Sequence, residues 1–163
     1  MRLTQWTDYA LRVLMYCAAH EKRDAAPTIA EIAEVHGISR SHLMKVVMAL
    51  AAKGWLSTTR GRGGGLRLLR PPGEIVVGEV IRQMEEDFTL VECFDAQGNA
   101  CRLDGMCRLK TTLGRALQAY MAVLDAVTLA ELVPARGRLQ AFTLPPLIPV
   151  APRRPVGGGA RRD

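Results

Sequence analysis

The chain has 163 residues, of which 48% are hydrophobic and only 5% aromatic, so it suits one compact domain with an appendage, built of helices packed through aliphatic side chains. It has no apolar run close to the ~20 residues that cross a membrane and no signal-peptide pattern, which argues against a membrane or secreted protein and predicts a reducing cytoplasm. The net charge of +6 is uneven: residues 1–70 hold eleven Lys/Arg against five Asp/Glu, whereas residues 71–133 hold five against ten, so the first half is expected to meet a polyanion.

The first predicted helix covers residues 4–20. Its apolar positions recur at helical spacing and form one stripe: Trp6, Ala10, Val13, Leu14 and Cys17. Because Cys17 lies on this stripe, we interpret it as a core residue rather than a ligand. Asp8 and Arg12 stand four residues apart, the spacing of an ion pair on a helix surface.

Two further predicted helices, at residues 28–36 and 39–51, indicate a helix-turn-helix. Thr28 and Glu31 have capping-box spacing at the start of the first helix, Gly37 ends it, and Ser39 caps the second. In this motif the N-terminal residues of the second helix reach base edges in the DNA major groove. The candidates here are polar or charged: Ser39, Arg40, Ser41, His42 and Lys45.

A basic, glycine-rich hairpin follows. Predicted strands at residues 55–59 and 66–69 flank the tip Arg60-Gly61-Arg62-Gly63-Gly64-Gly65. Phosphate-cradling glycine loops open a helix, whereas this one returns into a strand, so it predicts the wing of a winged helix. Arginines on such a tip can grip phosphates or enter the minor groove of double-stranded DNA. The predicted DNA-binding set is completed by Thr28, Arg60, Arg62, Gly63 and Gly64.

Three of the four cysteines, Cys93, Cys101 and Cys107, lie in one polar, turn-rich segment after a short predicted helix at residues 76–84. Clustered thiols in such surroundings indicate a disulfide or a metal, and three is an odd count for disulfides. Thiolates select zinc, copper(I) or iron–sulfur clusters. The intervals of seven and five residues are wider than zinc knuckles and suit a cluster. Zinc, redox-active thiols and a small iron–sulfur electron carrier remain open at this point.

The last predicted helix begins at a Thr111 cap and runs to about residue 132. Its apolar positions step by four, three, four and three: Leu113, Leu117, Tyr120, Leu124 and Val127. Met121 and Val123 widen this surface, so a second copy of the chain is the expected partner. Two copies would present two recognition helices to a near-palindromic operator. The Pro/Gly/Arg-rich residues 134–163 are expected to be disordered.

Four segments together resemble one known family: residues 3–12 (LTQWTDYALR), residues 38–47 (ISRSHLMKVV), the glycine tip, and residues 90–94 (LVECF) with two later cysteines. Over about residues 1–133 the chain resembles the iron–sulfur winged-helix repressors, and most of all their nitric-oxide-sensitive members. Lys110 stands where the sister regulators of cluster assembly have a histidine, which argues against that branch.

The resemblance implies a homodimer that binds one iron–sulfur cluster per subunit, 4Fe-4S with 2Fe-2S as the alternative. The implied ligands are Cys93, Cys101, Cys107 and the partner subunit's Asp8, with Arg12 orienting that carboxylate. In function it implies a cytoplasmic repressor whose cluster reacts with nitric oxide, releasing DNA and derepressing nitric-oxide detoxification genes. The alternatives are a zinc- or thiol-redox-dependent regulator, or an iron–sulfur regulator that responds to cluster status or oxidative stress.

The expected fold is mainly α with a small β wing. It combines a winged helix-turn-helix DNA-binding domain at residues 1–88 with a cluster loop and dimerisation helix at residues 89–133, followed by the tail. An enzyme is not expected, because no Ser/His/Asp arrangement is recognisable and the three histidines lie on helices assigned to packing or DNA.

Overall fold

The computed structural model describes residues 3–61, 63–95, 98–103 and 105–133. Its elements in chain order are α1 (Gln5–Ala19), α2 (Ile29–His36), α3 (Arg40–Ala52), β1 (Leu56–Thr59), β2 (Gly65–Leu68), the 3-10 turn η1 (Pro72–Glu74), α4 (Val77–Met84), the 3-10 turn η2 (Glu92–Phe94), α5 (Arg108–Asp125) and α6 (Leu129–Leu132). The predicted fold class, mainly α with a two-stranded wing, is confirmed. Among the described residues, no helix has the length and apolarity to span a membrane.

The helix-turn-helix begins and turns where its capping residues predict. The Thr28 hydroxyl accepts a hydrogen bond from the Glu31 amide, and the Glu31 carboxylate accepts one from the Thr28 amide. Gly37 ends α2 in the left-handed region at φ 64°, a conformation that costs glycine little. Ser39 then caps α3 by accepting a hydrogen bond from the His42 amide. The relative direction of α2 and α3 is therefore set by local hydrogen bonds.

The hairpin pairs β1 and β2 antiparallel, with Leu56 opposite Leu68 and Thr59 opposite Gly65. β2 also lies against the segment before α2, because the Leu66 amide donates to the Pro27 carbonyl at 2.8 Å. A Cβ on Gly65 would come within 2.7 Å of that carbonyl oxygen, so this close approach requires glycine. The base of the wing is thus fixed to the helix-turn-helix.

The hydrophobic core gathers around α1, which α3, α4 and α6 contact. Its largest fully buried members are Leu14, Ile32, Leu43, Leu50, Trp55, Leu56, Ile75 and Leu129. Cys17 belongs to the same core and is only 3% exposed, which confirms its predicted packing role. Burial raises the pKa of its thiol to about 12, because a thiolate would lose its hydration there.

The last long helix differs from its prediction at both ends. It begins at Arg108, with Cys107 rather than Thr111 at the N-cap, and it ends at Asp125. A separate short helix, α6, follows behind a capping box between Thr128 and Glu131. The break has a tertiary cause: the Val77 amide donates to the Val127 carbonyl at 2.9 Å, which holds the end of α5 against the start of α4.

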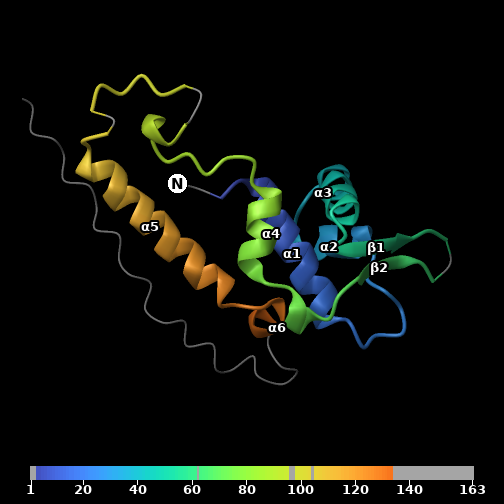
Figure 1. Cartoon of the computed structure of the whole chain (residues 1–163). Coiled ribbons are helices and arrows are strands. Elements are labelled where there is room, and N and C mark those ends of the chain that lie inside the picture. The colour runs from blue at the N-terminus through green and yellow to red at the C-terminus, as the bar shows by residue number, and fades with distance from the viewer. Residues whose placement is uncertain (1–2, 62, 96–97, 104, 134–163) are drawn as a thin grey trace, which may run out of the picture.

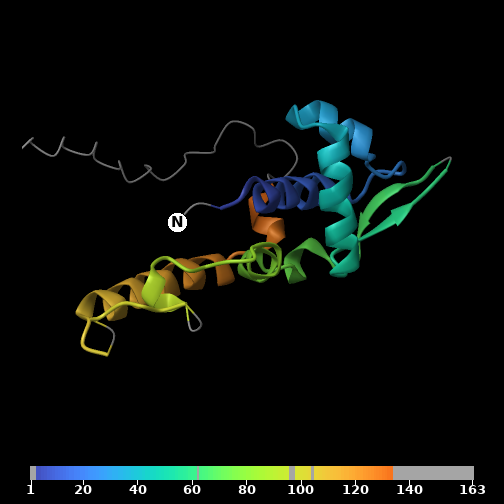
Figure 2. The ribbon, with the colours of Figure 1, turned by 90° about the horizontal axis from the view of Figure 1, so that it is seen from above.

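Helix α5 and the cysteine segment form one end of the molecule, and the hairpin forms the other (Figures 1 and 2). The chain leaves α4, runs along α5 through η2, and turns back into α5. None of the residues of α5 is buried. The chain's own core therefore covers the apolar stripe of this helix only in part, since Leu113, Leu117, Tyr120 and Leu124 are all of intermediate exposure.

Candidate metal centre and nucleic-acid interface

The three clustered cysteines lie at different places in the segment between α4 and α5. Cys93 is in η2, Cys101 follows a turn, and Cys107 is the N-cap of α5. All three are free thiols of intermediate exposure. The Asn99 side chain accepts a hydrogen bond from the Cys101 amide at 3.0 Å, and the Glu92 carboxylate accepts one from the Ala100 amide at 2.9 Å. Local polar contacts therefore give the loop its shape.

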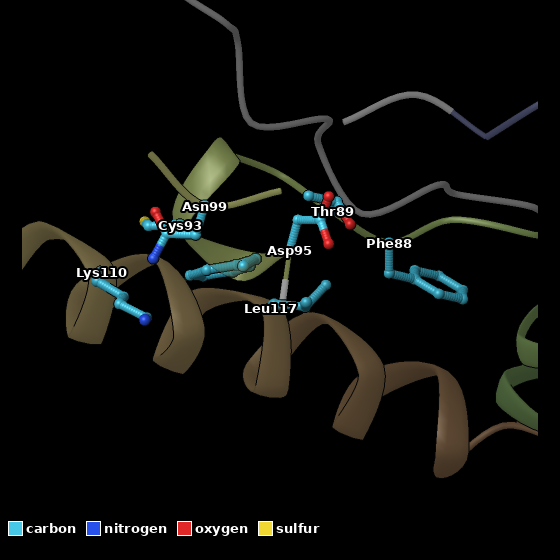
Figure 3. A pocket seen from close by; sticks show the side chains of 8 residues that line it. Phe88, Thr89, Cys93, Asp95, Asn99, Lys110 and Leu117 are labelled. Carbon is cyan, nitrogen blue, oxygen red and sulfur yellow. The ribbon is translucent and has the colours of Figure 1, made fainter. Parts of the chain in front are cut away.

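Cys93 and Cys107 line two different pockets beside α5. The larger, of about 590 Å³, is lined by Phe88, Thr89, Cys93, Phe94, Asp95, Asn99, Lys110 and Leu117. Figure 3 shows Cys93, Asp95 and Asn99 of the loop lying over α5, with Leu117 on the side of the helix that faces the loop and the Lys110 side chain lying along the helix. The smaller, of about 310 Å³, contains Cys107 and again Lys110. Lys110 is thus common to the surroundings of both thiols.

The structure brings the three cysteines to one loop but not to one point. In the part of the chain that it describes, no three His, Cys, Asp or Glu residues come close enough to hold a metal ion. The donor set nevertheless fits a soft metal centre, since three free, partly exposed thiols stand within one loop. Thiols that were structural would be buried and inert, as Cys17 is.

Asp8 lies in the first turn of α1 and is held in a two-point contact with Arg12. The Arg12 Nε donates to Asp8 Oδ1 at 3.1 Å, and Nη2 lies 2.9 Å from Oδ2. The Asp8 carboxylate raises the pKa of the Arg12 guanidinium through this hydrogen bond. Both side chains are 44% exposed, so the carboxylate is oriented and still accessible to solvent.

The start of α1 is tied to the start of the cysteine loop within the same chain. Glu85, which follows α4, accepts hydrogen bonds from the Thr4 amide at 2.7 Å and the Thr4 hydroxyl at 3.1 Å. Thr4 is the N-cap of the helix that carries Asp8. Sequence reasoning missed this contact because the two residues are 81 positions apart.

Four of the ten predicted DNA-binding residues line one groove between α3 and the hairpin. The groove has a volume of about 380 Å³, and four of its lining residues belong to the predicted set: Thr28, Arg40, Arg60 and Gly64. Ser41 and Lys45 are exposed on α3, and Ser39 and Gly63 are exposed at the cap and the hairpin tip. Arg62 lies outside the described residues.

His42 differs from its neighbours on α3. Its ring centroid lies 5.1 Å from that of Tyr9 and 6.3 Å from that of Trp6, so the imidazole packs against α1. In contrast, Met44 and Met48, which sequence reasoning did not select, line the groove and are 50% and 67% exposed. The available signal was their spacing, since both continue the exposed row that starts at Arg40.

Comparison with known proteins finds similarity along most of the chain. The profile of the Rrf2 family, described as iron-dependent transcriptional regulators, matches residues 3–135. The chain is 51% identical over 133 residues to the HTH-type transcriptional regulator NsrR of Bacillus subtilis, covering 82% of this chain and 90% of that protein. It is 47% identical to the NsrR of Geobacillus kaustophilus, covering 87% and 96%. Among solved structures it resembles CymR of B. subtilis, a global cysteine regulator, with a TM-score of 0.65, 25% identity, and 81% and 95% coverage.

Proposed function

The chain belongs to the Rrf2 family of transcriptional regulators, and from this premise we propose that it is a dimeric repressor that senses nitric oxide through an iron–sulfur cluster. It is a DNA-binding transcriptional regulator and not an enzyme, as its sequence predicts. The observation that carries the finer proposal is the set of three free, partly exposed thiols in one loop of a chain that is 51% identical to a regulator named NsrR.

Cys93, Cys101 and Cys107 would hold the cluster, with the partner subunit's Asp8 as fourth ligand and 4Fe-4S as the proposed type. When bound, the cluster supplies iron that reacts with nitric oxide. A carboxylate is a hard ligand beside soft thiolates, so Asp8 would be the most weakly bound of the four ligands. The two contacts from Arg12 restrict the rotation of that carboxylate and reduce the entropy lost when it binds.

A second copy of the chain is the proposed cover for α5. The helix has no buried residue, and Leu109 and Val123 are 60% and 67% exposed. An apolar helical stripe of this kind is stabilised by packing against another helix. In such a dimer the two α3 helices would enter successive major grooves about 34–36 Å apart.

Helix α4 is the proposed link between the cluster loop and the DNA-binding face. At one end Glu85 joins the loop to Thr4. On its sides Arg82 makes a two-point ion pair with Asp125 of α5, at 2.6 and 2.5 Å, and Gln83 accepts a hydrogen bond from the Trp55 indole at 3.0 Å. Trp55 stands at the base of the hairpin. A change in the loop is therefore passed to α1, α5 and the wing through contacts of one short helix.

We propose that the two domains predicted from the sequence have separate functions. Residues 1–88 bind DNA, and residues 89–133 bind the cluster and the second subunit. Leu129 of α6 is fully buried in the core of the first unit. Residues 89–133 are thus joined to residues 1–88 at both ends, by α4 before them and by α6 within them. This arrangement suits a sensor whose state changes the position of the DNA-binding elements.

Metal analysis of anaerobically purified protein tests this proposal. We expect a coloured protein with iron and sulfide, and loss of both in the Cys93→Ala, Cys101→Ala and Cys107→Ala variants. Cys17→Ala is the matched control, because that thiol is buried in the core and should leave the iron content unchanged. A colourless protein with stoichiometric zinc would instead establish a zinc-dependent regulator.

A further inference from the structure

The recognition helix α3 presents an apolar row on its exposed side. Met44 and Met48 are 50% and 67% exposed, whereas Leu43, Val46 and Leu50 of the same helix are fully buried. The core is thus complete without the two methionines. Met44 and Met48 are one turn apart on the outward side of the helix, and removing their apolar surface from water against a binding partner would be favourable.

The surroundings of this row favour a polyanion as the cover. Met44 and Met48 line the groove between α3 and the hairpin together with Arg40 and Arg60, and none of the described residues that line it is acidic. α3 itself contains no Asp or Glu. A protein partner for an apolar row needs no such cationic rim, whereas a DNA duplex brings phosphates to both edges of any helix in its major groove.

We propose that Met44 and Met48 are specificity-determining residues that contact the C5-methyl groups of thymines in the operator. The thymine methyl is the apolar group that the major groove displays. A thioether forms none of the two-point hydrogen bonds by which Arg, Asn or Gln read guanine and adenine, but its flexible chain adapts to a methyl surface. The inference rests on the DNA binding proposed above.

The dimensions of the helix agree with contacts to neighbouring bases. From Arg40 to Met48 the helix axis advances about 12 Å at about 1.5 Å per residue, close to the width of the major groove. The two methionines are separated by about 6 Å along that axis, or about two base-pair steps of about 3.4 Å each. The operator half-site is thus expected to carry thymines at two nearby positions under the middle of α3.

The test uses the full-length protein and duplexes selected from a random library. Each thymine of the selected half-site is replaced by deoxyuridine, which removes only the methyl group. For the wild type we expect each contacted methyl to change the Kd about fourfold, the factor that one buried methylene contributes. The Met44→Ala/Met48→Ala double variant should bind the thymine and deoxyuridine duplexes alike.

Two controls separate methyl reading from other effects. Met44→Leu and Met48→Leu retain an apolar end and should keep the dependence on the methyl group. Lys45→Ala should weaken binding to both duplexes equally, leaving their ratio unchanged. Thermal unfolding should be the same for all variants, since these side chains are exposed.

A thymine-to-deoxyuridine ratio of one in the wild type, or a ratio that survives in the double variant, would overturn the inference while leaving DNA binding intact. A selected half-site without thymine would overturn it as well. If no duplex is selected at all, the proposed function fails together with it.

Discussion

Replacing Gly78 with alanine tests how closely α4 is held against α5. A Cβ at this position would overlap the Oδ1 atom of Asp125 and would lie 3.0 Å from its Cγ and 3.1 Å from its backbone nitrogen. The carboxylate is not free to turn aside, because Arg82 donates to both of its oxygens. The substitution therefore forces the two helices apart or breaks the Arg82–Asp125 ion pair.

The magnitude follows from two opposing effects. An added methyl group in a close contact costs about 1–3 kcal/mol, whereas alanine in place of glycine stabilises a helix by at most about 0.5–1 kcal/mol at the second residue of α4. We expect Gly78→Ala to lower the free energy of unfolding by about 1 kcal/mol. Urea unfolding at a fixed protomer concentration measures it, since dimer formation would make the apparent stability depend on concentration.

Substitutions of Asp125, the residue that the added methyl group would contact, supply the matched controls. In an Asp125→Ala background the overlapping oxygen is gone and only the contact with the backbone nitrogen at 3.1 Å remains, so Gly78→Ala should lose most of its cost. In an Asp125→Asn background the shape is kept and the charge is lost, so the destabilisation should persist. If Gly78→Ala stabilises the wild type, or costs the same with alanine at position 125, the described α4–α5 contact is wrong.

Four further predictions concern the thiols, the DNA and the loop. Because burial holds the pKa of Cys17 at about 12, alkylation at pH 8 should label Cys93, Cys101 and Cys107 of the apo-protein fast and Cys17 only on unfolding; four equally fast thiols would contradict the core assignment. The same raised pKa means that the buried thiol's contribution to stability is present below pH 9.0, the ordinary thiol value, and is lost between pH 9.0 and about 12, which urea unfolding at several pH values measures. Lys45→Ala should lower the slope of log affinity against log salt by about 1, and an unchanged slope would place this side chain away from the phosphates. Glu85→Ala, which removes the contacts to Thr4, should leave iron binding intact and weaken DNA binding by the iron-loaded form; equal DNA affinity would remove Glu85 from the link.

The helix-turn-helix was predictable because its signals are local. Thr28, Glu31 and Ser39 form their caps with residues three positions away, so their spacing in the sequence already carries the geometry. The wing follows in the same way from a glycine tip between two short strands. The helix-turn-helix and the wing can therefore be predicted from local signals and their order along the chain.

The start and end of α5 depend on contacts that no local pattern contains. Thr111 is a residue type that favours the N-cap position, so the sequence predicts a helix start there. The helix instead begins after Cys107, and Thr111 lies inside it. The end is set by the pairing of Val77 with Val127 and of Ile75 with Leu129, which joins residues about 50 positions apart. Such tertiary hydrogen bonds override helical periodicity.

The exposed side of α3 shows the limit of reasoning by residue type. Polarity as the criterion leaves out Met44 and Met48, which are exposed, while His42, whose ring packs against Tyr9, stays a predicted DNA-binding residue. Position on the helix, rather than polarity, decides which side chains face outward.

The most direct test of the account is an anaerobic titration of the iron-loaded dimer with nitric oxide, in which visible absorbance and operator affinity are followed in the same sample. We predict that the affinity falls at least about tenfold, equivalent to about 1.4 kcal/mol, in step with the loss of the cluster spectrum. An affinity that stays constant after the spectrum has fully changed would contradict the central claim.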